Sequence, residues 1–296
     1  MFIYQTKDGK LNFVFGKTSL PKETSDFSLS QEADGTVELS IGDTVVVKGE
    51  TSGECKINDV EYATLVEAVE AAVDGDVITL LRDSEGAGIG LWEANPKSIT
   101  IDFAGYKYHV IGPAVGSTGT QSQAFHLEKG SRVTLKNGTV DAAPKSESKV
   151  AMLIQNYCDL TLDNMVCDCS NNSDITYVCS NNFGSLTVKG NTQIIAANNR
   201  VAFDLWFGLN KQGLYDDGLT VTFGSDFTGT VGGKVEYGAQ NATRVPEWIS
   251  RTKLDIYNGT FTGAIVASSN NFTLSDANIN VYGGTFESDT CDVFKK

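Results

Sequence analysis

The sequence has few prolines, few histidines and little positive charge. It holds 5 Pro and 2 His in 296 residues, and 23 Lys and Arg stand against 37 Asp and Glu, a formal net charge of -14. A nucleic acid or an anionic membrane surface requires a basic footprint, so neither is expected as a partner. The chain also lacks an apolar run of about 18 residues, which a membrane-spanning helix needs. Its opening residues lack the basic and apolar regions of a signal peptide. We therefore expect a protein that is made and folded in a cytoplasm.

Cysteine is also sparse for a chain of this length. The six residues are Cys55, Cys158, Cys167, Cys169, Cys179 and Cys291. Four of them alternate with apolar residues, which predicts reduced, buried side chains rather than a disulfide framework. Cys167 and Cys169 alternate along one strand pattern, unlike the wider spacing of a zinc knuckle. His109 and His126 stand beside Tyr or Phe and are expected to be packed imidazoles. No metal or cofactor is expected.

What the sequence does contain is a repeated pattern of two aliphatic residues two positions apart, a turn and a further apolar residue. One copy reads Arg-Val-Thr-Leu-Lys-Asn-Gly-Thr-Val at residues 132–140. The first aliphatic residues of the copies are Ile78, Ile99, Val133, Leu160, Leu186, Leu219, Leu254 and Ile279, spaced by 21 to 35 residues. Second short strands are predicted before several copies, at 124–127, 151–154, 176–179, 201–205 and 264–267. A single unit cannot bury its own apolar face, but units stacked on one another can bury it.

Stacked as a coil, each unit would pair its backbone with the units before and after it. Successive strands would then lie about 4.8 Å apart, with Val133, Leu160, Leu254 and Ile279 in one continuous file. Four asparagines follow the second aliphatic position: Asn137, Asn164, Asn191 and Asn258. Turns favour asparagine there because it tolerates left-handed backbone, and stacked amides can form hydrogen bonds. A β-sandwich remains the alternative, whereas leucine-rich and propeller repeats fail on motif and period.

One helix is predicted, at about residues 64–73. Thr64 and Glu67 form a capping box, and Asp74-Gly75 ends the segment. Its apolar stripe consists of Leu65, Ala68, Val69, Ala72 and Val73. An apolar strand follows at 76–81. A helix placed before the first of many stacked strands would cover the end of their core.

The first 50 residues form a separate block. Strands are expected at 2–4 and 11–15, around an Asp-Gly turn, and again at 36–41 and 44–48, with a polar stretch at 16–32 between the pairs. Residues 51–54 read as a linker. The predicted organisation is a small β module at 1–50 followed by the repeat region at 51–296.

Residues 57–296 resemble the right-handed parallel β-helix of the pectin-lyase-like superfamily. The segment 62–81 is similar to the capping helix and first rung of that family, and Asn-Gly-Thr-Phe and Gly-Gly-Thr-Phe at 258–261 and 283–286 are similar to its later turns. The resemblance implies an all-β chain, a right-handed parallel β-helix with an N-terminal capping helix, preceded by a small β module. It specifies a fold and not a chemistry.

The sequence contains two kinds of residue pattern that could be catalytic. Residues 244–251 resemble the Arg-x-Pro-x-x-Arg element of pectate lyases, but the second Arg comes two residues late and no matching acidic motif is present. Hydrolases on this fold need converging carboxylates. The candidate sets are Asp163, Asp168 and Asp174, or Asp204, Asp216 and Asp217. Aspartates at turns commonly bind backbone amides instead, so no catalytic residue is assigned. The residues expected to bind ligands at the surface are Trp92, Trp248, Arg244 and Arg251.

The resemblance, the two-part layout and the missing catalytic set favour a non-enzymatic phage virion protein. A fibre, spike or decoration subunit of this kind is attached to other virion proteins through residues 1–50, is commonly trimeric, and projects a rigid β-helix that can adhere to a host surface or carbohydrate. Its location would be the virion. The alternatives are a polysaccharide lyase or hydrolase acting as a depolymerase spike, and a bacterial surface adhesin.

Overall fold

The computed structural model describes residues 53–198, 200–207, 218–239, 250–267 and 277–287, together with the backbone of five strands in the first 50 residues. The chain divides into two compact units, Met1–Ser52 and Gly53–Lys296. That these units are separate domains, with a particle-anchoring role for residues 1–50, stays a prediction.

Met1–Ser52 contains two antiparallel sheets. β1 (Phe2–Gln5) pairs with β2 (Leu11–Val14). β4 (Thr36–Ile41) pairs with both β3 (Phe27–Gln31) and β5 (Thr44–Glu50). The four expected strands are present, but β3 lies within the stretch expected to be polar and irregular. The alternation Phe-Ser-Leu-Ser in that segment is the period of a strand, and the surrounding polar residues obscured it.

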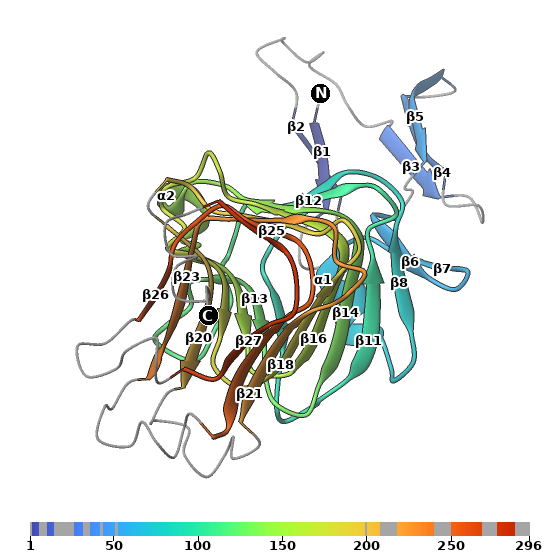
Figure 1. Cartoon of the computed structure of the whole chain (residues 1–296). Coiled ribbons are helices and arrows are strands. Elements are labelled where there is room, and N and C mark those ends of the chain that lie inside the picture. The colour runs from blue at the N-terminus through green and yellow to red at the C-terminus, as the bar shows by residue number, and fades with distance from the viewer. Residues whose placement is uncertain are drawn as a thin grey trace. The chain divides into compact units, whose positions relative to one another are not determined.

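The larger unit contains a sheet of seven strands, all parallel (Figure 1). In spatial order they are β10 (Ile89–Leu91), β13 (Gln123–Leu127), β15 (Met152–Asn156), β17 (Tyr177–Asn181), β20 (Val201–Phe207), β23 (Lys234–Ala239) and β26 (Ile265–Ala267). Five of them, β13, β15, β17, β20 and β26, coincide with the second short strands of the repeat. Those five strand predictions are confirmed.

A second sheet has sixteen strands. Its main path runs β7 (Val60–Tyr62), β6 (Cys55–Ile57), β8 (Val77–Leu80), β11 (Ser98–Asp102), β14 (Arg132–Ala142), β16 (Asp159–Asp168), β18 (Gly184–Lys189), β21 (Leu219–Phe223), β24 (Thr252–Ile256) and β27 (Ile279–Val281). Its side branch contains β9 (Ser84–Gly86), β12 (Lys107–Val110), β19 (Gln193–Ile195), β22 (Thr230–Gly232), β25 (Thr260–Phe261) and β28 (Thr285–Phe286). The pairs are parallel except those of β6 with β7 and β8. β14 and β16 are long enough to join path and branch.

The inward residues of the main path form one file in register. It consists of Ile99, Val133, Leu160, Leu186, Val221, Leu254 and Ile279. All are buried except Ile279, which is partly buried against the same core. The prediction that Val133, Leu160, Leu254 and Ile279 share a file is confirmed.

Two copies of the repeat were aligned incorrectly. Leu186 pairs with Val221 rather than with Leu219, and Ile78 pairs with Ile101 rather than with Ile99. A shift of two residues keeps the same side chains on the inner face. The hydrophobic pattern alone therefore cannot distinguish the two registers.

Helix α1 (Leu65–Ala71) buries Leu65, Ala68 and Val69 in the core, and Thr64 Oγ1 accepts a hydrogen bond from the Glu67 backbone N–H at 3.2 Å. The helix ends two residues before the predicted position, because Ala72 is extended (ψ 145°). Val73 is therefore 65% exposed instead of belonging to the apolar stripe. A second, short helix, α2 (Lys145–Ser148), was not predicted.

Two of the predicted asparagine positions have left-handed backbone, at Asn137 (φ 58°) and Asn164 (φ 53°). Neither ends its strand, since β14 and β16 continue across them. Asn164 Oδ1 accepts a hydrogen bond from the Asn191 backbone N–H at 2.9 Å, so one coil is tied to the next.

The larger unit is thus all-β, with long parallel sheets in an arrangement compatible with a β-helix. In the part of the chain that the structure describes, neither helix has the length or apolarity to cross a membrane.

Candidate functional site

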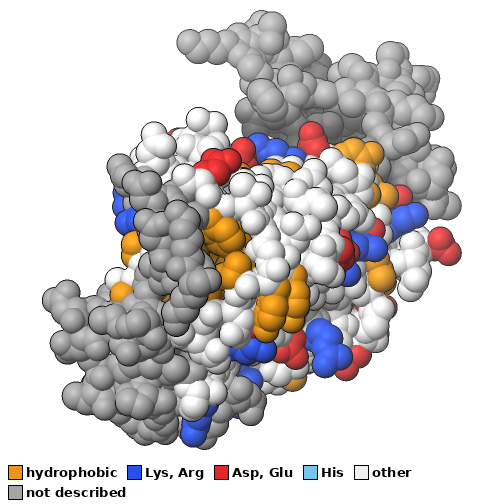
Figure 2. Space-filling model, viewed as in Figure 1, with side chains coloured by type: hydrophobic (Ala, Val, Ile, Leu, Met, Phe, Trp, Pro, Cys, Tyr) orange, Lys and Arg blue, Asp and Glu red, His pale blue; other side chains and the backbone are white. Residues whose placement is uncertain are grey.

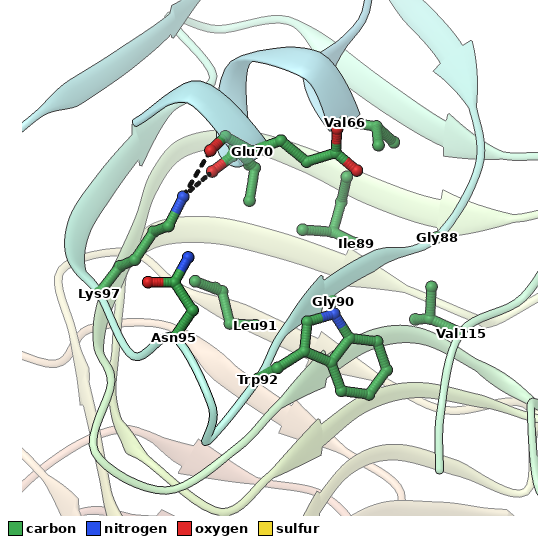
Figure 3. Close-up of a pocket in the computed structure, with 11 residues that line it drawn as sticks. Val66, Glu70, Gly88, Ile89, Gly90, Leu91, Trp92, Asn95, Lys97 and Val115 are labelled. Carbon is green, nitrogen blue, oxygen red and sulfur yellow. Dashed lines mark hydrogen bonds between the residues drawn. The ribbon is translucent and has the colours of Figure 1, made fainter. Parts of the chain in front are cut away.

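A hollow of about 440 Å³ lies between α1, β10 and the loop that carries Val115. Figure 3 shows Glu70 on the α1 side and Trp92 and Asn95 on the opposite side. Ile89 and Leu91 of β10 lie between them and are buried beneath the hollow. The volume and the mixed lining fall within the range of small-molecule sites, which is about 300–1,000 Å³.

Glycine shapes the strand side of this hollow. A Cβ built on Gly90 would lie 2.6 Å from Trp92 Cζ2, so only glycine lets the indole rest against the strand. A Cβ on Gly88 would lie 3.0 Å from the carbonyl oxygen of Ala124. Trp92 remains 40% exposed although its ring is fixed in this way. The result is a rigid, accessible aromatic surface.

Lys97 fixes the opposite wall. It is 9% exposed, and its Nζ donates hydrogen bonds to the carbonyl oxygens of Val69 and Glu70 at 2.8 and 2.7 Å. These carbonyls belong to the last turn of α1, where the helix has no further N–H donors of its own. A cation is also favoured at this end of a helix by the macrodipole. Lys97 therefore holds α1 against the segment that carries Trp92.

An aromatic strip continues from Trp92 across the outer side of the seven-stranded sheet. The ring of His126 lies 5.3 Å from that of Trp92 and 5.8 Å from that of Tyr157. The ring of Phe183 is stacked 6.0 Å beyond Tyr157. Tyr157 and Phe183 line a second hollow of about 290 Å³. The strip thus runs from the first hollow to the second.

A file of polar side chains runs beside this strip. His126, Gln155, Ser180 and Asp204 occupy one register position on successive strands, and each is at most 6% exposed. Asp204 accepts hydrogen bonds from the Asn181 backbone N–H at 2.7 Å and from Ser180 Oγ at 3.2 Å.

Asp204 is the carboxyl group most strongly affected by its surroundings. Burial raises the pKa of Asp204, the hydrogen bonds from Asn181 and Ser180 oppose that effect, and the charge of Glu236 adds to it; the resulting pKa is about 8. Glu236 is the register partner of Asp204 on the next strand. A carboxyl group that is protonated near neutral pH beside a second carboxyl group has the composition of an acid–base pair.

Of the first predicted carboxylate set, Asp168 and Asp174 line one hollow and Asp163 is not among its lining residues. Asp168 accepts a hydrogen bond from the Ser170 backbone N–H, and Asp174 accepts one from that of Lys145. Asp163 is paired with Lys189 at 3.2 Å. These are the structural roles that turns and surfaces usually give to aspartate. Asp216 and Asp217 lie outside the described residues.

A third hollow, of about 280 Å³, contains a histidine and several acids. His109 Nδ1 lies 2.6 Å from Asp141 Oδ1, and Lys107 Nζ lies 2.6 Å from the other oxygen of the same carboxylate. Asp168 and Asp174 also line this hollow. Asp141 is therefore already bound by Lys107 and His109, and a structural role accounts for this arrangement.

Of the residues expected to bind ligands, Trp92 lines the first hollow. Arg251 is exposed in the turn before β24, where its carbonyl oxygen accepts a hydrogen bond from the Leu219 backbone N–H at 2.8 Å. Arg244 and Trp248 lie outside the described residues. A binding role for all four stays a prediction. The structure does not place Trp92 and Arg251 in a common hollow.

The sequence does not predict that His126, Tyr157 and Asp204 lie together along the aromatic strip and the polar file of the seven-stranded sheet. They are 31 to 78 positions apart in the chain, and only the register of the seven-stranded sheet brings them together. The one signal available was their position next to predicted short strands.

The described cysteines are free and buried, namely Cys55, Cys158, Cys167, Cys169 and Cys179. For these five the prediction of buried, reduced side chains is confirmed, and Cys291 lies outside the described residues. Burial raises the pKa of Cys55 and of Cys167 to about 12, so both are thiols at neutral pH. Within the described ranges, no group of three or more His, Cys, Asp or Glu is arranged to hold a metal ion.

The chain was also compared with protein-family models, with curated proteins and with solved structures. None of the three comparisons finds a match.

Proposed function

We propose that the larger unit is a right-handed parallel β-helix closed at its N-terminal end by α1, and that the chain is a non-enzymatic structural subunit of a phage virion. The subunit would be a head or tail fibre, a spike or a decoration protein. In this proposal residues 1–50 attach to other virion proteins, the subunits form a homotrimer, and the β-helix projects outward to adhere to a host surface or glycan.

The observation that supports this proposal is the uninterrupted inward file from Ile99 to Ile279. Each coil pairs its backbone with the coils on either side, and the aliphatic residues between them exclude water. A stack built in this way resists bending because any bend must separate paired strands and open the core. Such stiffness suits a part that holds a binding surface away from a particle.

The test uses the source phage with residues 1–50 deleted from this chain. Purified particles are analysed by quantitative mass spectrometry, and the truncated protein is examined separately by circular dichroism during thermal unfolding. We expect the truncated protein to unfold cooperatively and to be missing from the particles. Full-length Trp92→Ala is the control and should be incorporated normally. Particles without the full-length protein would refute the virion assignment, and particles that retain the truncated protein would refute the anchoring role.

A second candidate is a polysaccharide-cleaving enzyme, and Asp204 is the observation that favours it. Glycoside hydrolysis uses one protonated and one ionised carboxyl group, and Asp204 with Glu236 provides two carboxyl groups on paired strands. Release of reducing ends from the host capsule, lost in Asp204→Asn, would support this candidate. Absence of release from capsule and pectin by the wild-type protein would count against it.

A further inference from the structure

We infer that the hollow beside Trp92 binds one neutral hexopyranose unit of a glycan. The inference rests on the proposed function, because it names the ligand class that a projecting adhesive subunit would hold. It concerns the hollow under α1, bounded by Glu70, Ile89, Trp92, Asn95 and Lys97.

The aromatic wall fits one face of a pyranose ring. The C–H bonds on the less polar face of a sugar carry slight positive charge, and the face of an indole is negative. Trp92 is 40% exposed and is fixed against Gly90, so it needs little reorganisation on binding. Ile89 and Leu91 lie beneath the hollow and are each 1% exposed, so the indole provides the accessible apolar surface of this wall.

The polar groups around the hollow fit hydroxyl groups. Glu70 offers carboxylate oxygens as acceptors, and Asn95 offers both a donor and an acceptor through its amide. Both side chains are exposed, and they reach the hollow from opposite sides (Figure 3). Neighbouring hydroxyls of a sugar are donors and acceptors at once, so they can bind a carboxylate and an amide together.

The charge of the lining favours a neutral ligand. Glu70 and Lys97 are the two charged residues among those that line the hollow, so their formal charges cancel. Lys97 already donates to two carbonyl oxygens of α1. An anionic ligand would therefore place its charge beside the Glu70 carboxylate and a partly apolar wall, with the Lys97 ammonium already bound to two carbonyl oxygens. Next to Trp92, the Glu93 backbone N–H donates to Glu128 Oε2 at 2.9 Å, and the other oxygen of Glu128 lies 3.1 Å from His126 Nε2, so a uronate would also approach the Glu93 carboxylate.

The experiment measures binding of methyl glycosides to the full chain by saturation-transfer-difference NMR with titration. The neutral probes are the methyl glycosides of glucose, galactose and mannose, and the charged probes are methyl glucuronoside and methyl glucosaminide. We expect at least one neutral probe to bind with a Kd of about 1 mM, which corresponds to about -4 kcal/mol. Trp92→Ala should weaken that binding at least about tenfold, and Trp92→Phe should weaken it less.

Tyr282→Ala is the matched control. Tyr282 is another exposed aromatic residue, 63% exposed, and it stacks on Tyr257 at the last described coil. Its removal should leave the Kd unchanged within about twofold, the scatter expected when no contact is lost. Circular dichroism establishes that each variant is folded.

The inference is overturned if no neutral probe binds, if Trp92→Ala binds as the wild type does, or if a charged probe binds more tightly than every neutral one. Its failure is distinct from failure of the proposed function, because incorporation into particles is measured without any sugar. Particles that contain the protein and bind no hexoside would refute this inference alone. A protein that binds a hexoside through Trp92 and is absent from particles would refute the virion assignment alone.

Discussion

The sixteen-stranded sheet has an outward file of partly exposed threonines flanked by paired charges, whereas the seven-stranded sheet has an outward file of buried polar groups from His126 to Asp204. On the larger sheet the register file contains Thr100, Thr134, Thr161, Thr187 and Thr222, all partly exposed. Acidic and basic side chains are interspersed on the surface that Figure 2 displays. On the smaller sheet the equivalent file, from His126 to Asp204, is at most 6% exposed.

The two sheets also differ in the pKa of an aspartate, which is lowered at Asp102 on the larger sheet and raised at Asp204 on the smaller sheet. Burial acts to raise the pKa of Asp102, but hydrogen bonds from the Ala104 backbone N–H, Asn137 and Lys136 outweigh it and lower the pKa of this carboxyl group. Burial of Asp204 is more complete, and its two hydrogen bonds leave its pKa raised to about 8. Similar backbone geometry thus gives a surface ion pair on one sheet and a protonated acid on the other.

Whether an outward carboxyl group has a raised pKa is therefore decided by how exposed the outer face of its sheet is. The alternation of residues along the strand does not decide it. Paired charges on an exposed sheet are screened by water and change stability little. A carboxyl group on a covered sheet cannot be solvated, so its protonation responds to its neighbours. At outward strand positions, a raised carboxyl pKa is therefore expected on the seven-stranded sheet rather than on the larger one.

The largest expected effect comes from breaking the core that both sheets share. Phe223 is fully buried, and its ring lies 5.1 Å from that of Phe203 on the seven-stranded sheet and 5.0 Å from that of Phe261. Phe223→Ala should lower the free energy of unfolding by about 3–5 kcal/mol, measured by urea denaturation. Thr222→Ala, the adjacent outward position, should change it by less than about 0.5 kcal/mol. Equal losses in the two variants would contradict the assignment of inner and outer faces.

The second expected effect is that Asp204 and Asp102 change the pH dependence of the free energy of unfolding in opposite directions. Since the pKa of Asp204 is about 8 when folded and about 3.9 when unfolded, the folded chain holds the extra proton between these values. The free energy of unfolding therefore decreases as pH rises through this window. Asp204→Asn removes this loss and should be more stable than the wild type at pH 9 by at least about 1.4 kcal/mol, the equivalent of one pKa unit.

Asp102→Asn is the control on the other sheet. The lowered pKa of Asp102 gives stability that is present above its unfolded pKa and lost as pH falls through the folded one. Asp102→Asn should therefore be less stable than the wild type at neutral pH, the opposite sign. Thermal unfolding from pH 2 to 9 measures both. A lower stability of Asp204→Asn at pH 9 would refute the raised pKa.

A smaller effect is expected from the buried asparagines inside the seven-stranded sheet. Asn181 is fully buried; its Nδ2 donates to the Asp204 carbonyl oxygen at 3.1 Å, and its Oδ1 accepts from Asn156 Nδ2 at 3.2 Å. Asn181→Ala removes both of these buried hydrogen bonds and should cost about 1–3 kcal/mol in urea denaturation. Asn280→Ala, a partly exposed asparagine on the other sheet that donates to Asp255 at 2.9 Å, should cost less than about half as much. A reversed order would contradict the difference in burial.

The smallest effect is expected from the surface ion pairs of the sixteen-stranded sheet. Lys136 Nζ lies 3.1 Å from Asp102, and Lys189 Nζ lies 3.2 Å from Asp163. Lys136→Ala and Lys189→Ala should each lower the free energy of unfolding by about 0.2–1 kcal/mol, less in 1 M NaCl because salt screens exposed charges. A larger loss of unfolding free energy that does not depend on salt would show that these ion pairs are not exposed to solvent.

Much of the inner face could be predicted from the sequence. The alternation of aliphatic residues in the repeat identified Val133, Leu160 and Leu254 as one file, and the register confirms it. Leu219 was aligned incorrectly because a shift of two residues leaves the alternation unchanged. The sequence names Trp92 as a surface residue but does not predict the hollow beside it, since Lys97 carries no local signal of contact with α1.

The sequence by itself determined that the chain forms strands and which side chains of each strand face inward, because alternation is a local property of the backbone. Only the tertiary structure decided which outward positions become neighbours. Spacings of 21 to 35 residues between copies leave the register open, and Asp204 meets Ser180 and Glu236 only when the coils are stacked. Burial of an outward file depends on what covers the sheet, a contact between distant segments that no strand encodes alone.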